Sequence, residues 1–140
     1  MTLIEKYIAS NHFGKLIGMH FDIIGEGEVQ YHIRIEEKHL ATPLAAHGGL
    51  ISALVDGALG VAALSAVYQE NRVVSTVEYK INFLAPALAG DMLLAHAMVE
   101  QKGGRLLIVG CEVRCTNRAN KLIAKALGTF NAYDAVKAGY

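Results

Sequence analysis

The chain has 140 residues and a mass of 15.1 kDa, which predicts a single domain. Apolar residues make up 53% of the chain and charged residues 19%, with only two prolines, so a disordered chain is excluded and a sizeable core is expected. The 13 basic and 13 acidic residues balance to zero net charge. This argues against nucleic-acid binding, because neutralising phosphates needs a basic excess. A neutral chain this apolar also favours self-association.

Cysteine content and targeting signals indicate an ordinary cytoplasmic protein. Cys111 and Cys115 are too few for a disulfide framework or a four-ligand zinc site, so we expect reduced thiols. The first residues lack the basic-then-apolar order of a secretion signal. The histidines have no metal-ligand spacing and no phosphate-binding loop is present, so the sequence predicts neither a metal nor a cofactor. The apolar run 50–67 is interrupted by Asp56, which would cost about 2.5–3.5 kcal/mol within a bilayer, and a buried core helix is predicted instead.

The N-terminal third predicts a helical extension followed by a hairpin. Apolar residues in 1–17 recur with helical spacing from residue 3 onward, and they predict a short amphipathic helix that frays near Asn11. Over 19–35 apolar residues alternate with polar ones, and Gly25-Glu-Gly27 separates two such runs, a pattern typical of a β-hairpin. Residues 36–46 are predicted to form a loop.

The rest of the chain predicts one long helix and four strands. Residues 47–70 are almost without polar side chains, so we expect a helix that is buried on nearly every side. The alternating runs that follow are joined by tight turns, and such strands pair antiparallel because parallel pairing needs long crossovers. We therefore expect a four-strand antiparallel meander, and a sheet that wraps around the central helix in one α+β domain spanning 1–140. The predicted strands cover residues 73–84, 92–101, 105–116 and 122–133.

Several motifs in this layout resemble the hotdog-fold thioesterases, and specifically their PaaI-like branch. The resemblance is carried by His47-Gly-Gly-Leu-Ile-Ser-Ala-Leu-Val-Asp56, by Thr76-Val-Glu-Tyr-Lys-Ile-Asn-Phe-Leu-Ala-Pro86, and by the Gly90-Asp91 and Gly104-Arg105 pairs. It extends over residues 18–132. The resemblance implies a hotdog fold and an acyl-CoA thioesterase, which hydrolyses a thioester to a free acid and CoA without a metal or redox cofactor.

Asp56 is the sharpest functional signal in the sequence. It is a lone carboxylate in an apolar helix, and no Lys or Arg lies between Leu40 and Asn71 to pair with it. The carboxylate must meet another strand, a partner chain or a ligand, unless core hydroxyls or backbone groups satisfy it. In PaaI-like enzymes the matching Asp is the catalytic carboxylate, which implies that Asp56 acts as general base or nucleophile. An apolar setting raises a carboxyl pKa, and this favours a base that works near neutrality.

Gly48 and Gly49 stand at the entrance of the helix, where the first N–H groups lack an intrahelical partner and the helix dipole is positive. A thioester carbonyl placed there gains a donor as it becomes an oxyanion, an effect of roughly 3–4 kcal/mol. The alternative is that the glycines only form a tight turn into the helix. The resemblance favours the Gly48 N–H as oxyanion donor, with Gly49 and His47 beside the substrate. His47 is expected to order this loop by hydrogen bonding.

The spacing of these residues predicts a site shared between two chains. His47 and Asp56 are nine residues apart, which is half a turn out of phase and about 13 Å along a helix. By the same reasoning, Gly48 and Asp56 of one chain are too far apart to hold one thioester. We expect Gly48 of one chain to meet Asp56 of another, in a homodimer or a tetramer of two dimers. Acyl-CoA is the expected ligand, with neither nucleic acid nor membrane as partner.

The chain departs from the family pattern at two positions for polar helper residues. Many relatives carry Asn where this chain has Ala41, and some carry Ser or Arg where it has Ala85. Ser52, on the helical face of Asp56, and Asn82, on the neighbouring strand, are candidate substitutes. The departures leave open a non-catalytic module that binds acyl-CoA or an acyl-carrier protein, whereas a dehydratase is disfavoured because no His–acid pair lies near Asp56. Candidate cations for the CoA phosphates are Lys80, Lys102, Arg105, Arg118 and Lys121.

Overall fold

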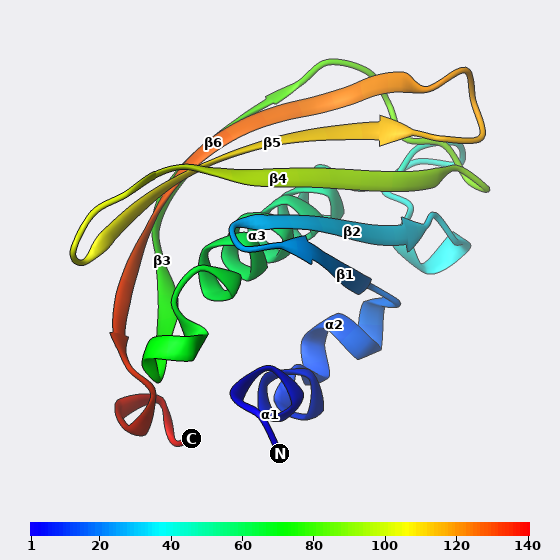
Figure 1. Ribbon diagram of the computed structural model, residues 1–140. Helices are drawn as coiled ribbons and strands as arrows, with labels where there is room; N and C mark the ends of the chain where they lie inside the picture. Colours follow the sequence, from blue (N-terminus) through cyan, green and yellow to red (C-terminus); the bar gives the residue numbers. More distant parts are fainter.

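A curved antiparallel sheet arches over one long helix in the computed structural model, which describes residues 1–140 (Figure 1). Short 3₁₀ turns, η1 (Glu37–His39), η2 (Tyr68–Glu70) and η3 (Ala135–Ala138), lie between or after the main elements. The helices are α1 (Leu3–Ser10), α2 (His12–Ile17) and α3 (Gly48–Ser65). The strands are β1 (His20–Gly25), β2 (Glu28–Arg34), β3 (Arg72–Phe83), β4 (Met92–Lys102), β5 (Leu106–Cys115) and β6 (Lys121–Asp134).

The core lies between α3 and the concave face of the sheet. Alternate residues of β5, among them Leu107, Val109 and Val113, have no solvent exposure, as expected for a strand with one buried face. Leu54 and Leu59 of α3 are equally inaccessible. Removing these side chains from water is the main term that stabilises the fold. The arrangement confirms the predicted α+β architecture, a sheet wrapped around a central helix.

The predicted four-strand meander is wrong in one respect. The strand order is β1-β2-β4-β5-β6-β3, and every neighbouring pair is antiparallel. β3 therefore pairs with β6 rather than β4, and the meander consists of β4, β5 and β6 alone. The connection over 84–91, which contains Pro86, is too long for a two-residue hairpin. It carries the chain from the edge of the sheet to a central position.

α3 is also shorter than predicted. It ends at Ser65, whose hydroxyl donates to the Ala62 carbonyl and accepts a hydrogen bond from the Gly27 N–H. Beyond it, η2 is a separate turn. The Lys102 ammonium lies 2.8 Å from the Ala66 carbonyl, and it satisfies one of the carbonyl groups that a helix end leaves without an intrahelical partner.

One face of α3 is open, which corrects the prediction of burial on nearly every side. Ser52, Asp56, Gly57 and Gly60 are only half-buried, whereas the face toward the sheet is buried. By length and composition alone α3 could cross a membrane, but most of it is packed inside the domain. The open face is therefore the part of the helix that is available to other groups.

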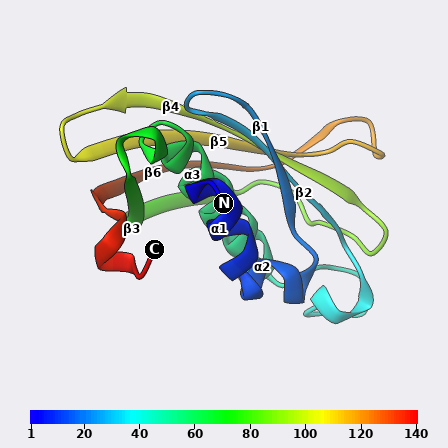
Figure 2. The ribbon, with the colours of Figure 1, turned by 60° about the horizontal axis from the view of Figure 1, so that its bottom comes forward.

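The N-terminal extension forms two helices rather than one frayed helix. Thr2 and Glu5 form a reciprocal capping box at the start of α1. The break falls at Asn11, whose side-chain oxygen accepts from the Gly14 N–H while its amide donates to the Tyr31 hydroxyl. α1 and η3 lie on the same side of the sheet as α3 (Figures 1 and 2).

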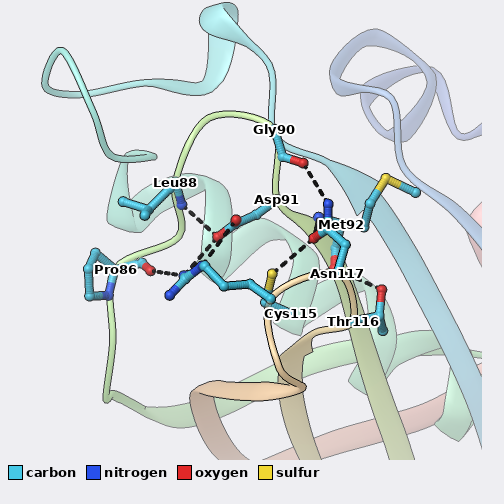
Figure 3. A network of polar contacts seen from close by, with 9 residues as sticks. Pro86, Leu88, Gly90, Asp91, Met92, Cys115, Thr116 and Asn117 are labelled. Carbon is cyan, nitrogen blue, oxygen red and sulfur yellow. Dashed lines mark hydrogen bonds and ion pairs between the residues drawn. The ribbon is translucent and has the colours of Figure 1, made fainter.

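A polar network fixes the connection between β3 and β4 (Figure 3). The buried Asp91 carboxylate accepts from the Leu88 N–H and from Arg118 at 2.9 Å, and Arg118 also donates to the Pro86 carbonyl. Burial alone would raise the pKa of Asp91, but the hydrogen bonds from Arg118 and Leu88 outweigh it and lower that pKa. Asn117 accepts from the Met92 N–H and donates to the Gly90 carbonyl.

We predict that Arg118→Gln lowers the free energy of unfolding by about 1–3 kcal/mol, because it leaves a buried carboxylate short of its charged donor. Urea unfolding at fixed protein concentration measures this. The matched control is Arg114→Gln, since Arg114 pairs with Glu112 where both side chains are more than a third exposed. That change should cost less than about 1 kcal/mol. Equal effects of the two substitutions would contradict a structural role for the Arg118–Asp91 pair.

Candidate active site

Asp56 projects from the open face of α3 toward the edge strand β3. Its Oδ1 accepts a hydrogen bond of 2.7 Å from the Thr76 hydroxyl. The carboxylate is half-buried, not enclosed in an apolar core as the sequence suggested. The sequence left open whether Asp56 meets another strand, a partner chain or a ligand. Within the chain, β3 supplies the partner of Oδ1. No hydrogen-bond donor within the chain reaches the other oxygen, Oδ2, which leaves it available to water or a ligand.

Tyr79 and Ser52 extend this polar group. Burial, and then the negative charge of Asp56, raise the pKa of the Tyr79 phenol, an effect that the neighbouring Ser52 side chain partly offsets. Tyr79 therefore remains a protonated hydroxyl near the carboxylate at neutral pH. Ser52 lies one turn before Asp56 on the open face of α3.

Sequence reasoning missed Thr76 and Tyr79 because they are three residues apart and would face opposite sides of a regular strand. A β-bulge between Thr76 and Glu78 shifts the register with β6. The extra residue, Val77, lets both side chains face α3. No local sequence signal marks this bulge; only the pairing with β6 reveals it.

The start of α3 has a free donor at Gly48. His47 is the N-cap residue, and its Nδ1 accepts a 2.7 Å hydrogen bond from the Gly49 N–H. This hydrogen bond occupies the Gly49 donor and leaves Nε2 as the protonated ring nitrogen. The Gly48 N–H has no acceptor within the chain, as expected for the first residue of a helix. His47 thus orders the loop, as predicted, and Gly48 carries the available donor.

Gly48 and Asp56 line two different cavities. Asp56 borders a cavity of about 320 Å³ with Gly57, Thr76 and Phe130. Gly48 borders another of about 380 Å³, which includes Phe83, Pro86 and neighbouring apolar residues. Eight residues of helix separate the donor from the carboxylate, a rise of about 12 Å. Within one chain, therefore, the two groups do not converge on a common point.

Asn82 does not join the group around Asp56. Its neighbours on β3, Ile81 and Phe83, face the core and Gly48 respectively. Because side chains alternate along a strand, Asn82 lies on the outer face of the sheet.

Three of the five candidate cations are engaged within the chain. Lys102 pairs with Glu70, Arg105 donates to Asn131, and Arg118 belongs to the Asp91 network. Lys80 and Lys121 form no ion pair within the chain.

Known proteins share both the sequence pattern and the fold. The profile of the Thioesterase superfamily matches residues 45–120, a segment that contains α3 and β3 to β5. PA0474 of Pseudomonas aeruginosa, provisionally named an esterase, is 33% identical over 99 residues, which cover 71% of this chain and 71% of that protein. The Escherichia coli PaaI protein from the phenylacetic acid degradation operon has a TM-score of 0.84 at 22% identity, covering 93% of this chain and 90% of that one. The smu.793 protein of Streptococcus mutans, solved bound to acetyl CoA, has a TM-score of 0.72 at 26% identity, covering 82% and 90%.

The profile match spans over half of the chain, and the structural match to PaaI confirms the predicted hotdog fold and the resemblance to the PaaI-like proteins at the level of the fold. The chain belongs to the thioesterase superfamily, a family of thioester hydrolases.

Proposed function

We propose that this protein is an acyl-CoA thioesterase whose active sites form between two copies of the chain, each site using Gly48 of one copy and Asp56 of the other. One observation carries the proposal. α3 carries both a Gly48 N–H without an acceptor and an Asp56 carboxylate with one oxygen unbonded, but the two groups line separate cavities. A second copy supplies the missing partner of each.

The surface beside the two groups suits a second copy of the chain. β3 is an edge strand of 12 residues, paired only with β6, so one row of its backbone groups is unpaired. Its side chains Val77 and Phe83, and Leu84 beyond it, are more than half exposed. A homodimer formed along this edge would bring Gly48 and Asp56 of different chains together.

The proposed reaction uses one water molecule and no metal. Thr76 holds Oδ1 of Asp56, which leaves Oδ2 to take a proton from water as the water oxygen attacks the thioester carbonyl carbon. The carbonyl oxygen becomes an oxyanion that accepts a hydrogen bond from the Gly48 N–H of the other chain. When the C–S bond breaks, the electron pair leaves on the CoA sulfur, which takes up a proton. In the variant with Asp56 as nucleophile, Oδ2 attacks the carbonyl carbon, the C–S bond breaks and the CoA sulfur leaves and takes up a proton. Water then hydrolyses the mixed anhydride, which releases the free acid and regenerates the Asp56 carboxylate.

The choice of acyl-CoA as substrate class is supported by membership of the thioesterase superfamily and by the acetyl CoA bound to the S. mutans relative. The choice of Asp56 as the base follows from its environment. It is the one charged side chain on the open face of α3, and no Lys or Arg neutralises it.

We predict that Asp56→Asn lowers kcat for the best acyl-CoA by at least about 100-fold, because the amide cannot accept the proton of water. Thiol release, followed with a thiol-trapping dye, measures the rate, and circular dichroism checks the fold. The control Asp22→Asn changes an exposed carboxylate on β1 and should leave kcat within about twofold. Near wild-type turnover by Asp56→Asn would refute the assignment of the base. Tight binding of acyl-CoA by the wild type without any thiol release would instead favour a binding module.

A second prediction concerns the Gly48 donor and its place in the other chain. Proline is tolerated at the first position of a helix, and His47 has the extended backbone that a following proline requires. Gly48→Pro therefore removes the N–H with little other change, and it should lower kcat by about 100- to 1,000-fold. The control Gly48→Ala keeps the N–H, has ordinary contact space beside Phe83, and should lose far less.

Mixing the two inactive variants tests whether the site is shared. A heterodimer of Asp56→Asn and Gly48→Pro places both defects in one cleft and leaves the other intact. With random reassortment, half of the dimers are heterodimers, and one of the two clefts in each heterodimer is intact. About a quarter of wild-type activity should therefore return. Mass spectrometry verifies the exchange of subunits. If exchange is complete and no activity returns, each chain carries its own site and the shared arrangement is wrong.

A further inference from the structure

The cavity beside Asp56 is elongated along α3. It extends from Asp56 to Leu64, and these eight residues span about 12 Å of helix. β3 runs antiparallel alongside, with Thr76 at the carboxylate and Val73 in contact with the Leu64 end. A thioester carbonyl held at Asp56 would therefore direct its acyl chain down this cavity toward Leu64. The length of the cavity sets a limit on the acyl chain that fits.

The outer wall of the cavity comes from segments at opposite ends of the sequence. Tyr7 of α1 and the C-terminal residues Ala138 and Tyr140 line it, and α1 and η3 lie close to the open face of α3 (Figures 1 and 2). The Ser10 and Tyr140 hydroxyls are 2.8 Å apart and tie the two segments together. Burial, together with the neighbouring Tyr31, Tyr140 and Asp56, raises the pKa of the Tyr7 phenol well above its ordinary value. Tyr7 therefore contributes an uncharged wall.

The lining of the cavity is suited to an uncharged group. It contains no Lys, Arg or His, and Asp56 at one end is its only charged side chain. A terminal carboxylate on the acyl chain would be buried without a cationic partner, at a large cost. The volume of the cavity, about 320 Å³, is within the range of small-molecule sites. Gly60 lets the Phe130 ring of the lining pack close to the helix, because a Cβ on Gly60 would lie 3.3 Å from that ring.

We propose that this cavity is the acyl-binding site, that it selects uncharged acyl groups, and that Tyr7, Ala138 and Tyr140 are its specificity-determining outer wall. The proposal rests on the proposed thioesterase function and adds the substrate class to it. The selectivity comes from α1 and the C-terminal segment, which lie outside the motifs shared with other thioesterases.

The first test compares two substrates of equal chain length. Hexanoyl-CoA and adipoyl-CoA differ by a carboxylate at the far end of the acyl chain. Wild-type protein should hydrolyse hexanoyl-CoA with a kcat/KM at least about 100-fold higher, because the adipoyl carboxylate has no partner in the cavity. Equal values for the two substrates would overturn the proposed selectivity. Absence of thiol release from any acyl-CoA would instead overturn the thioesterase function itself.

The second test changes the outer wall and compares octanoyl-CoA with acetyl-CoA, whose acyl group does not reach that wall. Tyr140→Ala removes apolar contact, and Ala138→Trp, at an exposed position, fills space. Each should lower the octanoyl-to-acetyl ratio of kcat/KM about tenfold or more, because only the longer acyl group reaches the changed residue. The control Phe13→Ala alters an exposed aromatic residue outside this cavity, and it should leave the ratio of the two substrates unchanged.

The acetyl-CoA rate reports on folding within the same experiment. If Tyr140→Ala loses acetyl-CoA activity as well, that variant is misfolded and does not test the wall. Ala138→Trp then provides the test, because a bulky side chain at an exposed position does not disturb the core. An octanoyl-to-acetyl ratio that equals wild type in Ala138→Trp, with both substrates hydrolysed, would overturn the assignment of the wall while leaving the thioesterase function in place.

Discussion

The apolar surface of α3 has to be removed from water, and the rest of the fold follows from how this is done. A single helix of 18 residues is too apolar to stand at a surface. The six-stranded sheet curves around it, and alternate residues of β2, β4 and β5 are buried on the side of the helix. A sheet cannot enclose a helix completely without closing into a barrel. The curvature therefore leaves one strip of α3 uncovered. That strip carries the small residues and the only carboxylate of the helix, so the same packing that stabilises the domain also determines where a ligand or another chain can approach.

The N-terminal end and the middle of this strip carry groups of opposite hydrogen-bonding character. Its N-terminal end offers an N–H group at Gly48, ordered by the His47 cap, and the middle offers Asp56, ordered by Thr76. A donor and an acceptor on one rigid helix cannot move toward one another, so their separation is fixed as firmly as the core itself. The donor and the carboxylate of one chain are too far apart to contact the same thioester group. Two antiparallel copies, however, would turn a fixed separation into two matched pairs, each with a defined geometry.

Much of the fold could be predicted from the sequence, because its main signals are local. The alternation of apolar and polar residues indicates the strands, and the long apolar run indicates α3. His47, Gly48 and Asp56 were identified from spacing and from a resemblance to known motifs. Features that depend on pairing between distant segments could not be obtained in this way. The partner of β3 is β6, 38 residues or more beyond it, and no local pattern distinguishes this partner from β4. The end of α3 at Ser65 depends on Gly27 and Lys102, which belong to other elements.

The bulge at Val77 has a consequence for how such a protein can change over time. It divides β3 into two short stretches whose inward-facing residues are set independently of each other. The stretch before it, which includes Val73 and Thr76, borders the cavity at Asp56, and the stretch after it, which ends at Phe83, borders the cavity at Gly48. Substitutions in one stretch can reshape one cavity without altering the register that serves the other. An interruption in one strand thus lets two cavity-lining surfaces diversify separately while they share a single hydrogen-bonded scaffold.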